Sequence, residues 1–486
     1  MDRITRQISA LLLGATLTGC TDFLTGPGLT VDPNNPTIAS KAQLFAAVAA
    51  SQQSMEEGAV AKMLVTWSQA MSGVARQSLT YQRYGVVEAD LSGMFARTYG
   101  GGGLVDIRAA IRLAKAEGDS SFAGIAMVYE ALIIGRAASI WGDIPYVEAV
   151  SDIAEPRLDA QESVYAAVQA KLDTAVQWIG KTGGANVGPG PADLIYAGDR
   201  TRWTQAANTL KARYYMHWVE AQLVGGSSLA AAAIACGGDC LQLAVSAATL
   251  GLASSANDFR TFHSTTSTEW NSWYGFLVIF RPGDMAAGRT MVDSLKARRT
   301  ALGDGRVRAY FDSVLVTGVF DFRGADRNGA ASPVGSALSV LSTTRFAQGY
   351  RQPIVTAAEN ALLLAEAQAR RGNDGPALVA LNAAKAASAA ANGVAVPAAG
   401  ALTGTALLTE IKMEAWIVLF QNLEAWNTLK RTCTPVLVPA GTATDVPGRM
   451  PYGLDERNTN RNIPAPQAQP LRNRNDPLPC SAPLHP

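Results

Sequence analysis

Histidines are few in this sequence, and the side chains that commonly carry out catalysis form no recognisable motif. The three histidines are His217, His263 and His485, and neither a His-Glu-x-x-His zinc motif nor a Gly-x-Ser-x-Gly nucleophile turn occurs. His217 lies beside Trp218 in an expected helix, so packing with a hydrogen bond explains it better than binding of a metal. Paired carboxylates for glycoside hydrolysis are defined by their separation in space, and nothing in the sequence indicates such a pair. We therefore expect no enzymatic activity, no cofactor and no metal.

Aromatic side chains, in contrast, gather with polar side chains in two segments. Residues 257–284 hold two tryptophans, one tyrosine and four phenylalanines among Ser, Thr and Asn, and residues 81–99 hold a second aromatic-polar group. Flat aromatic faces beside hydrogen-bonding groups suit sugar rings, whose C–H faces are apolar and whose edges carry hydroxyls. The alternative is that these rings fill the core beneath long loops. The ligand contacts that we predict are Trp270, Trp273, Tyr274, Tyr81 and Tyr84.

The N-terminus has the three parts of a secretory signal peptide. Arg3 and Arg6 give a positive start, residues 8–17 are apolar, and Leu17-Thr18-Gly19-Cys20 ends the run with small residues and a cysteine. This ending resembles a bacterial lipobox. The resemblance implies that the Cys20 thiol takes a diacylglyceryl group, that cleavage follows Gly19, and that the new amine is acylated. Several acyl chains anchor a protein stably in a leaflet. The alternative is an ordinary signal peptide with an incidental cysteine.

These observations divide the chain into an exported leader, a linker and a body. We expect residues 1–19 to be the lipoprotein signal peptide and residues 20–40 to be a lipid-anchored spacer, rich in turn formers such as Asp32-Pro33-Asn34-Asn35-Pro36. Residues 41–486 are then one domain. No later stretch approaches the ~20 apolar residues of a membrane span, so we expect the membrane to be reached through the lipid alone.

The other four cysteines are expected to form disulfides, because their number is even and the chain is exported. Cys236 and Cys240 enclose Gly-Gly-Asp, which suits a tight loop, and Cys433 with Cys480 would tie the end of a helix to the C-terminal tail. Chain-entropy estimates give roughly 2 kcal/mol for the short loop and roughly 4 kcal/mol for the long one. A zinc site is the weaker interpretation, because two thiolates supply only half of one.

The charge balance excludes one class of partner. Lys and Arg number 41 against 40 Asp and Glu, and the net charge is +1. Without a basic excess there is no electrostatic reason to expect a nucleic-acid partner.

Apolar residues at steps of three and four predict a mostly helical body. Asp159-x-x-Glu162 and Thr356-x-x-Glu359 are expected to be helix starts. Between the helices we expect long irregular stretches over 73–105, 181–200, 223–350 and 433–486, which in a compact protein are functional or contain further structure. Helix pairs of this length are typical of tetratricopeptide-like solenoids, although no fixed repeat is visible. The predicted helices cover residues 122–140, 164–179, 203–219, 356–372, 375–391 and 407–430.

Five segments occur in a fixed order behind Cys20. They are Gly124-Ile125-Ala126 with Trp141-Gly142-Asp143-Ile144-Pro145-Tyr146 and Glu148-Ala149; Gly198-Asp199 with Trp203, Ala207-Asn208-Thr209-Leu210-Lys211 and Arg213; Pro353 with Glu359 and Leu364-Ala365-Glu366-Ala367; Glu424-Ala425-Trp426 with Lys430-Arg431 and Pro435; and Pro447-Gly448-Arg449-Met450-Pro451-Tyr452 with Glu456 and Asn460. Together they resemble the SusD/RagB family of outer-membrane nutrient-binding lipoproteins. Lys430 departs from the family pattern, which usually has a second arginine there.

The motif residues themselves are interpreted as scaffold. Pro145 cannot continue a helix, so residues 142–145 are expected to stop one. We expect Trp203 and Trp426 to lie in the core, and Glu359 and Glu366, like Asn208, to be partners for buried backbone ends or for Arg213. The ligand site is therefore expected in the loops.

The resemblance implies a mainly α fold, with a tetratricopeptide-like scaffold of helical pairs that carries long irregular loops. It also implies a partner, a SusC-type TonB-dependent outer-membrane β-barrel. The lipoprotein would bind an oligosaccharide or a peptide at the cell exterior and deliver it to that barrel without breaking a bond. Two alternatives remain: a tetratricopeptide-like assembly lipoprotein that binds only proteins, and a surface glycan hydrolase, which would turn its ligand over.

Overall fold

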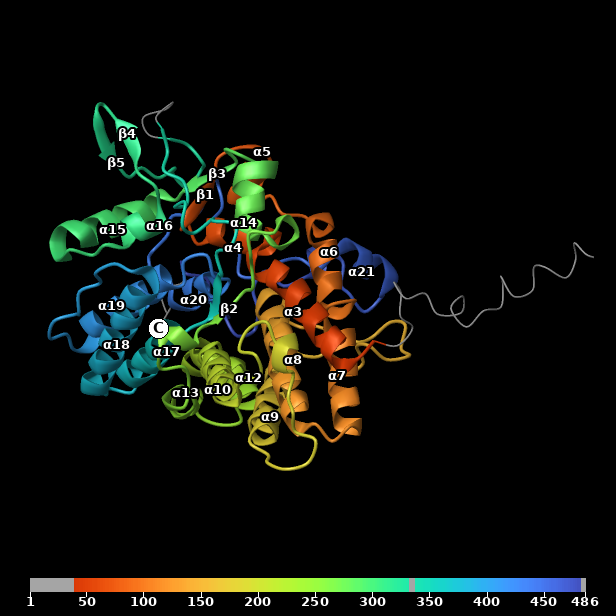
Figure 1. Ribbon diagram of the computed structural model, residues 1–486. Coiled ribbons are helices and arrows are strands. Elements are labelled where there is room, and N and C mark those ends of the chain that lie inside the picture. Colours follow the sequence, from red (N-terminus) through yellow and green to blue (C-terminus); the bar gives the residue numbers. More distant parts are fainter. Residues whose placement is uncertain (1–38, 332–336, 482–486) are drawn as a thin grey trace, which may run out of the picture.

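The structure is a computed structural model that describes residues 39–331 and 337–481. The predicted signal peptide, Cys20, most of the predicted spacer and His485 lie outside the described residues. Helices dominate the described chain, and the mainly α fold predicted from the sequence is confirmed (Figure 1). The longer helices are α3 (Lys41–Glu57), α4 (Ala59–Trp67), α6 (Glu88–Tyr99), α7 (Leu104–Ala116), α8 (Ser120–Trp141), α9 (Gln161–Ile179), α10 (Arg200–Met216), α12 (Gly226–Cys236), α13 (Cys240–Thr249), α15 (Arg289–Leu302), α17 (Ala357–Arg370), α18 (Asp374–Asn392), α19 (Gly404–Val418) and α20 (Glu424–Thr432).

Short elements connect these helices. The short helices are α5 (Arg76–Gln82), α11 (Val219–Val224), α14 (Ser272–Tyr274), α16 (Arg306–Tyr310), α21 (Leu454–Thr459), η1 (Gly190–Ala192), η2 (Ser255–Asn257), η3 (Ser267–Glu269), η4 (Gly275–Phe280) and η5 (Pro466–Ala468). The strands are β1 (Met71–Gly73), β2 (Phe259–Arg260), β3 (Met285–Ala287), β4 (Val314–Val316), β5 (Val319–Asp321) and β6 (Pro353–Val355).

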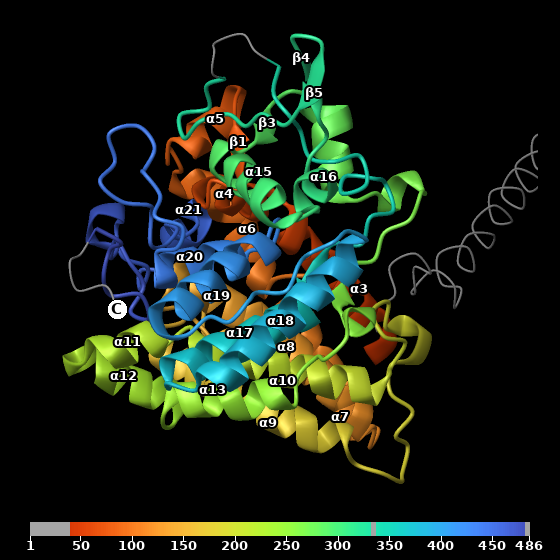
Figure 2. The same ribbon diagram turned by 90° about the vertical axis from the view of Figure 1, so that its left-hand side faces the viewer.

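α8 is the central helix of the scaffold. Every residue from Ser121 to Trp141 is buried, and α7, α9 and α10 pack around it. Glycines permit the closest approaches, because a Cβ at Gly124 would lie 2.8 Å from the carbonyl oxygen of Ala175 on α9, and a Cβ at Gly135 would meet the ring of Tyr214 on α10. The pairs α8–α9 and α17–α18 are the tetratricopeptide-like units of the fold, and Figure 2 shows α10, α13, α17 and α18 layered side by side.

Within residues 39–331 and 337–481, two segments are long and apolar enough to cross a membrane by length and composition, which corrects the expectation that none exists after the N-terminus. One is α8, whose most apolar 18-residue window is entirely buried inside the domain. The other, residues 226–249, is divided into α12 and α13 by a turn in which Gly237 has a φ of 73°. Burial on all sides explains the composition of α8, since a core helix has no solvent-facing stripe.

All four stretches expected to be irregular contain some secondary structure, including η1 in residues 181–200 and α21 and η5 in residues 433–486, and two of them contain several helices. Residues 73–105 include α5 and α6, and residues 223–350 include α12, α13, α15 and α16. The strands in these stretches pair mostly over long distances in sequence, as β1 does with β3 and β2 with β6. β4 and β5 form a local hairpin around Thr317 and Gly318, which both have positive φ, as such a turn requires. Figure 1 shows β1, β3, β4, β5, α5, α15 and α16 gathered at the upper end of the molecule.

The predicted helix 407–430 is wrong, because the chain breaks between α19 and α20. Gln421 adopts a φ of 66° at the break. Gln352 donates to the carbonyl oxygen of Gln421 at 2.7 Å, and Arg345 donates to the Gln421 side chain at 2.9 Å. Asn422 then accepts the backbone N–H of Glu424 and begins the next helix. Tertiary hydrogen bonds therefore override the apolar periodicity.

The start of α9 was predicted near the correct residue, but its cap was assigned incorrectly. Oδ1 of Asp143, in the turn after α8, accepts the N–H of Gln161 at 2.9 Å. Asp159 instead accepts the N–H groups of Tyr146 and Val147 in that turn. Asp143 in the turn after α8 thus binds the start of α9, and Asp159 just before α9 binds the turn. At the other expected start, Thr356 and Glu359 form the predicted capping box of α17.

Candidate functional site

Hydrogen bonds of Asn271 fix the loop between β2 and β3 at the start of α14. Oδ1 of Asn271 accepts the N–H of Trp273 at 2.7 Å, and its Nδ2 donates to the carbonyl oxygen of Tyr350 at 2.9 Å. The chain then passes through α14 into η4, a π-helix. π-helical turns are rare and are frequent at functional sites, because they point side chains in directions that an α-helix does not reach.

This loop and the N-terminal end of α4 enclose a hollow of about 430 Å³, which we call the aromatic pocket. Its wall combines aromatic rings with small polar side chains. Phe280 is 74% exposed, and the ring of Trp270 is half-buried. Nε1 of Trp270 donates to the carbonyl oxygen of Thr265, which fixes the ring at the rim. The side chains that matter here are Lys62, Ser267, Thr268, Trp270, Phe276 and Phe280.

A second hollow, larger than the aromatic pocket, lies elsewhere in the described chain. It has a volume of about 710 Å³ and lies between residues 443–451 and 466–481. Its lining is rich in proline, and no aromatic residue is part of it. Because an aromatic platform beside hydroxyl and amide groups is the better surface for a polar, ring-shaped ligand, we take the aromatic pocket as the candidate site.

Of the predicted contact residues in this loop, Trp270 lines the pocket, while Tyr274 supports it. The rings of Trp270 and Tyr274 meet edge to face with centroids 5.1 Å apart. The prediction that Trp273 contacts the ligand requires a correction, because this residue is fully buried and its Nε1 donates to Oε1 of Gln352 at 2.8 Å. Its ring packs in the core beneath the loop and does not face the pocket.

The structure does not bring Tyr81 and Tyr84 to this pocket. The hydroxyl of Tyr81 donates to Oδ1 of Asp90 at 3.1 Å, and the hydroxyl of Tyr84 accepts the N–H of Ala440 at 3.2 Å. Partial burial raises the pKa of both phenols. The ring of Tyr84 packs edge to face on Trp67. Both tyrosines are therefore engaged inside the fold, away from the aromatic pocket, and their role as ligand contacts stays a prediction.

Lys62 is a pocket residue that the sequence analysis missed. It lies on α4, is 7% exposed, and its Nζ donates to Oγ of Ser272 at 3.1 Å and to the carbonyl oxygen of Glu57. Nζ also lies 5.1 Å from the ring centre of Phe276. Burial lowers the pKa of Lys62 to about 7, against the opposing effect of Glu57. The available signal was one lysine inside an otherwise apolar helical run.

The carboxylate of Glu57 is directed to other partners. Nε2 of His263 lies 2.9 Å from Oε2 of Glu57, and the N–H of Ser272 donates to the same oxygen at 3.2 Å. Nδ1 of His263 lies 2.9 Å from the carbonyl oxygen of Glu269. The contacts of His263 and Ser272 attach the N-terminal half of the pocket loop to Glu57 at the end of α3.

The motif residues form the scaffold, as predicted from the sequence. Arg213 pairs with Glu359, and His217 lies between Tyr165 and Glu424. Trp203 and Trp426 are fully buried.

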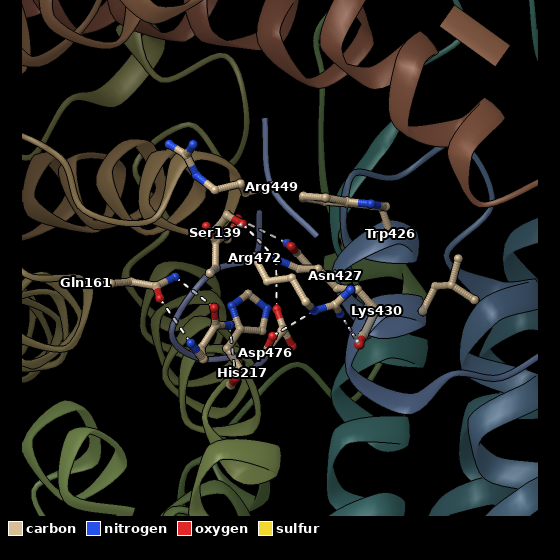
Figure 3. A network of polar contacts seen from close by, with 12 residues as sticks. Ser139, Gln161, His217, Trp426, Asn427, Lys430, Arg449, Arg472 and Asp476 are labelled. Carbon is tan, nitrogen blue, oxygen red and sulfur yellow. Dashed lines mark hydrogen bonds and ion pairs between the residues drawn. The ribbon is translucent and has the colours of Figure 1, made fainter. Parts of the chain in front are cut away.

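Lys430, the departure from the usual motif, belongs to a second buried polar network. Its Nζ donates to the carbonyl oxygen of Ser139 at 3.0 Å and lies 2.9 Å from Oδ2 of Asp476 (Figure 3). Arg472 donates to the backbone of Lys430 and of Asp476. The network therefore joins α8, α20 and the C-terminal segment, and the lysine is accommodated by a carboxylate of that segment.

Two disulfides are present in the described chain. Cys236 is bonded to Cys240 between α12 and α13, and Cys433 at the end of α20 is bonded to Cys480. The second bond holds the C-terminal segment against the scaffold.

Comparison with known proteins identifies a family whose sequence model matches this chain, and solved structures with a similar fold. The sequence model of the SusD-like family described as "Starch-binding associating with outer membrane" matches residues 33–454. No curated protein matches the sequence. Among solved structures, a chitin-binding protein is similar over 90% of this chain and 100% of its own, with 21% identity and a TM-score of 0.74.

Two further solved structures have the same fold. A chitin-binding SusD homologue from Flavobacterium johnsoniae is similar over 90% of this chain and 98% of its own, with 19% identity and a TM-score of 0.69. A SusD/RagB family protein from Bacteroides thetaiotaomicron is similar over 88% of this chain and 95% of its own, with 18% identity and a TM-score of 0.69. At these identities the likeness concerns the fold.

Proposed function

Because the chain belongs to the SusD-like family, described as starch-binding and associating with the outer membrane, we propose that it captures oligosaccharides at the cell surface in the aromatic pocket. It passes them to a SusC-type TonB-dependent β-barrel in the outer membrane, and it breaks no bond. The acylated Cys20 holds the protein on the outer membrane, facing the cell exterior. Residues 20–40 are the spacer between the lipid anchor and the domain.

The observation that carries this proposal is the composition of the aromatic pocket. Trp270, Phe276 and Phe280 offer ring faces, and Ser267 and Thr268 offer hydroxyls within a hollow of about 430 Å³. A sugar ring needs both, since its faces are apolar and its edges donate and accept hydrogen bonds. Two of the proteins with this fold are named as chitin-binding, which supports a saccharide over a peptide.

Binding without turnover is the first test. The chain without residues 1–20 is applied to an array of oligosaccharides and peptides, and each hit is titrated by calorimetry. We expect saturable saccharide binding, with the ligand recovered intact by chromatography after overnight incubation. Cleaved ligand would establish a hydrolase instead. Binding to peptides alone would exclude the saccharide assignment.

The anchor is tested separately. Cells that express the full chain or its Cys20→Ala variant are fed a labelled fatty acid, and membranes are separated by density. We expect label on the unchanged chain only, and we expect that chain in the outer-membrane fraction. A labelled variant would refute acylation at Cys20. Purification of the unchanged chain after mild detergent extraction is expected to recover the β-barrel with it.

A further inference from the structure

Lys62 is the one charged side chain that lines the aromatic pocket. Lysine is almost never fully buried unless it is paired with an opposite charge. Within the described residues, however, no carboxylate lies within 4.0 Å of its Nζ, since Glu57 contributes only its backbone oxygen and directs its carboxylate to His263 and Ser272. The lysine is therefore buried beside a hollow with no carboxylate in direct contact, and the carboxylate of Glu57 acts on it only from beyond 4.0 Å.

The hydrogen-bond count leads to the same conclusion. An ammonium group has three N–H donors. Two of those of Lys62 are accounted for by the carbonyl oxygen of Glu57 and by Oγ of Ser272. The rings of Trp273 and Phe276, with centres 4.8 Å and 5.1 Å from Nζ, attract the cation but accept no conventional hydrogen bond. One donor is thus left for a group that enters the pocket.

We infer that Lys62 binds a negatively charged group of the ligand, and that the pocket takes an acidic saccharide, with carboxylate or sulfate groups on its rings. This inference rests on the proposed function and specifies its substrate class. The aromatic rings contact the sugar faces, and Lys62 supplies selection by charge. Sulfate and carboxylate share the required chemistry, and the test separates them.

Charge at Lys62 also makes binding depend on pH. Burial lowers the pKa of Lys62 to about 7, so the ammonium loses its proton as pH rises above that value. An anion beside Nζ favours the protonated form. Binding then takes up a proton, and affinity for an acidic saccharide falls by up to tenfold per pH unit between about pH 7.5 and 9.5. The other titratable groups around Lys62 are Glu57 on α3 and His263 and Glu269 on the loop.

The test compares four tetrasaccharides on the chain without residues 1–20: a galacturonate, a heparin-derived sulfated saccharide, a maltose-series saccharide and a chitin-series saccharide. We expect at least one acidic ligand to bind tenfold or more tightly than both neutral ligands at pH 7, and the Lys62→Met variant to lose this preference. Lys296→Met on α15, outside the pocket, is the matched control and is expected to change nothing. Because Lys62→Met retains Glu57, His263 and Glu269, any pH dependence from those groups persists in it.

The outcomes separate the two proposals. If neutral ligands bind as tightly as acidic ones, or if Lys62→Met retains the acidic preference, the inference is overturned and the saccharide function stands. If no saccharide binds, both fall. The pH series on the unchanged chain needs no variant, so it tests the inference even if Lys62→Met fails to fold. A flat profile for the acidic ligand would also overturn it.

Discussion

Nη2 of Arg213, on α10, lies 2.7 Å from Oε2 of Glu359, on α17, and both side chains are buried. Nη2 also donates to the carbonyl oxygen of Ile354 in β6. The pair therefore joins two helices that lie far apart in the sequence. Glu424 on α20 lies on the other side of the same guanidinium, at 3.7 Å.

Removal of one partner of this pair should be strongly destabilising. We expect Glu359→Ala to lower the free energy of unfolding by about 3 to 5 kcal/mol, because it leaves the Arg213 charge buried with a weaker partner. Urea denaturation followed by circular dichroism measures the change. The control is Glu117→Ala, whose partner Lys41 keeps a second carboxylate, and we expect a change below about 0.5 kcal/mol. A loss as small as the control's would show that the pair does not stabilise the scaffold.

The ionisation of Glu424 should make the free energy of unfolding depend on pH. Burial alone would raise its pKa, but His217 and Arg213 lower the pKa to about 2. A carboxyl whose pKa is depressed in the folded state contributes stability above its unfolded value near 4.5, and this contribution is lost as pH falls toward 2. We expect about 3 kcal/mol of the free energy of unfolding to disappear over that window. In Glu424→Gln the slope between pH 5 and pH 2 should be smaller; an unchanged slope would contradict the assignment.

The two disulfides should contribute unequally. Closing the long loop between Cys433 and Cys480 restricts the unfolded chain more than closing the loop between Cys236 and Cys240. We expect the double serine variant of the long loop to lose about 4 kcal/mol and that of the short loop about 2 kcal/mol. Chemical denaturation of both variants without reductant measures this. Equal losses would show that loop length does not determine the effect.

Trp270 and Trp273 should respond differently to truncation. We expect Trp270→Ala to weaken saccharide binding about tenfold, or about 1.4 kcal/mol, with little effect on folding. Trp273→Ala should lower the free energy of unfolding by about 3 to 5 kcal/mol, because it empties a core position. Phe320→Ala on the exposed β4–β5 hairpin is the matched surface control for binding. If Trp270→Ala bound as well as that control, the pocket would not be the binding site.

The sequence was sufficient to predict the features of the fold that depend on residues close together in the chain. Apolar spacing located α8 and α9, and the capping box at Thr356 located the start of α17, because both of its residues lie within one turn. Asp159 was misassigned because two aspartates flank the same turn and only the fold decides which one caps α9. The break at Gln421 was missed because its causes, Gln352 and Arg345, are far away in the sequence.

The candidate site was only partly predictable for a similar reason. Trp270 and Trp273 lie three residues apart in one aromatic-rich segment, and neither a period of 2 nor one of 3.6 tells which of them faces outward in a loop that enters a π-helix. The only signal at Lys62 was its place in an otherwise apolar helical run, and its pocket partner Ser272 is brought by the fold from more than two hundred residues away.

The apolar core helix α8 has a consequence for export. In the proposed export, an unfolded chain that crosses the inner membrane would present these 22 residues, with a mean hydropathy of 1.4 in their most apolar window, to the translocation machinery before any core exists. Such a segment risks lateral release into lipid as a stop-transfer sequence. Glu130 lies at the middle of this segment and Arg136 toward its C-terminal end, and a charge at the centre of a spanning helix costs about 2.5 to 3.5 kcal/mol on insertion. The two residues that later bury ion pairs with Lys171 and Glu56 therefore also disfavour retention in the wrong membrane.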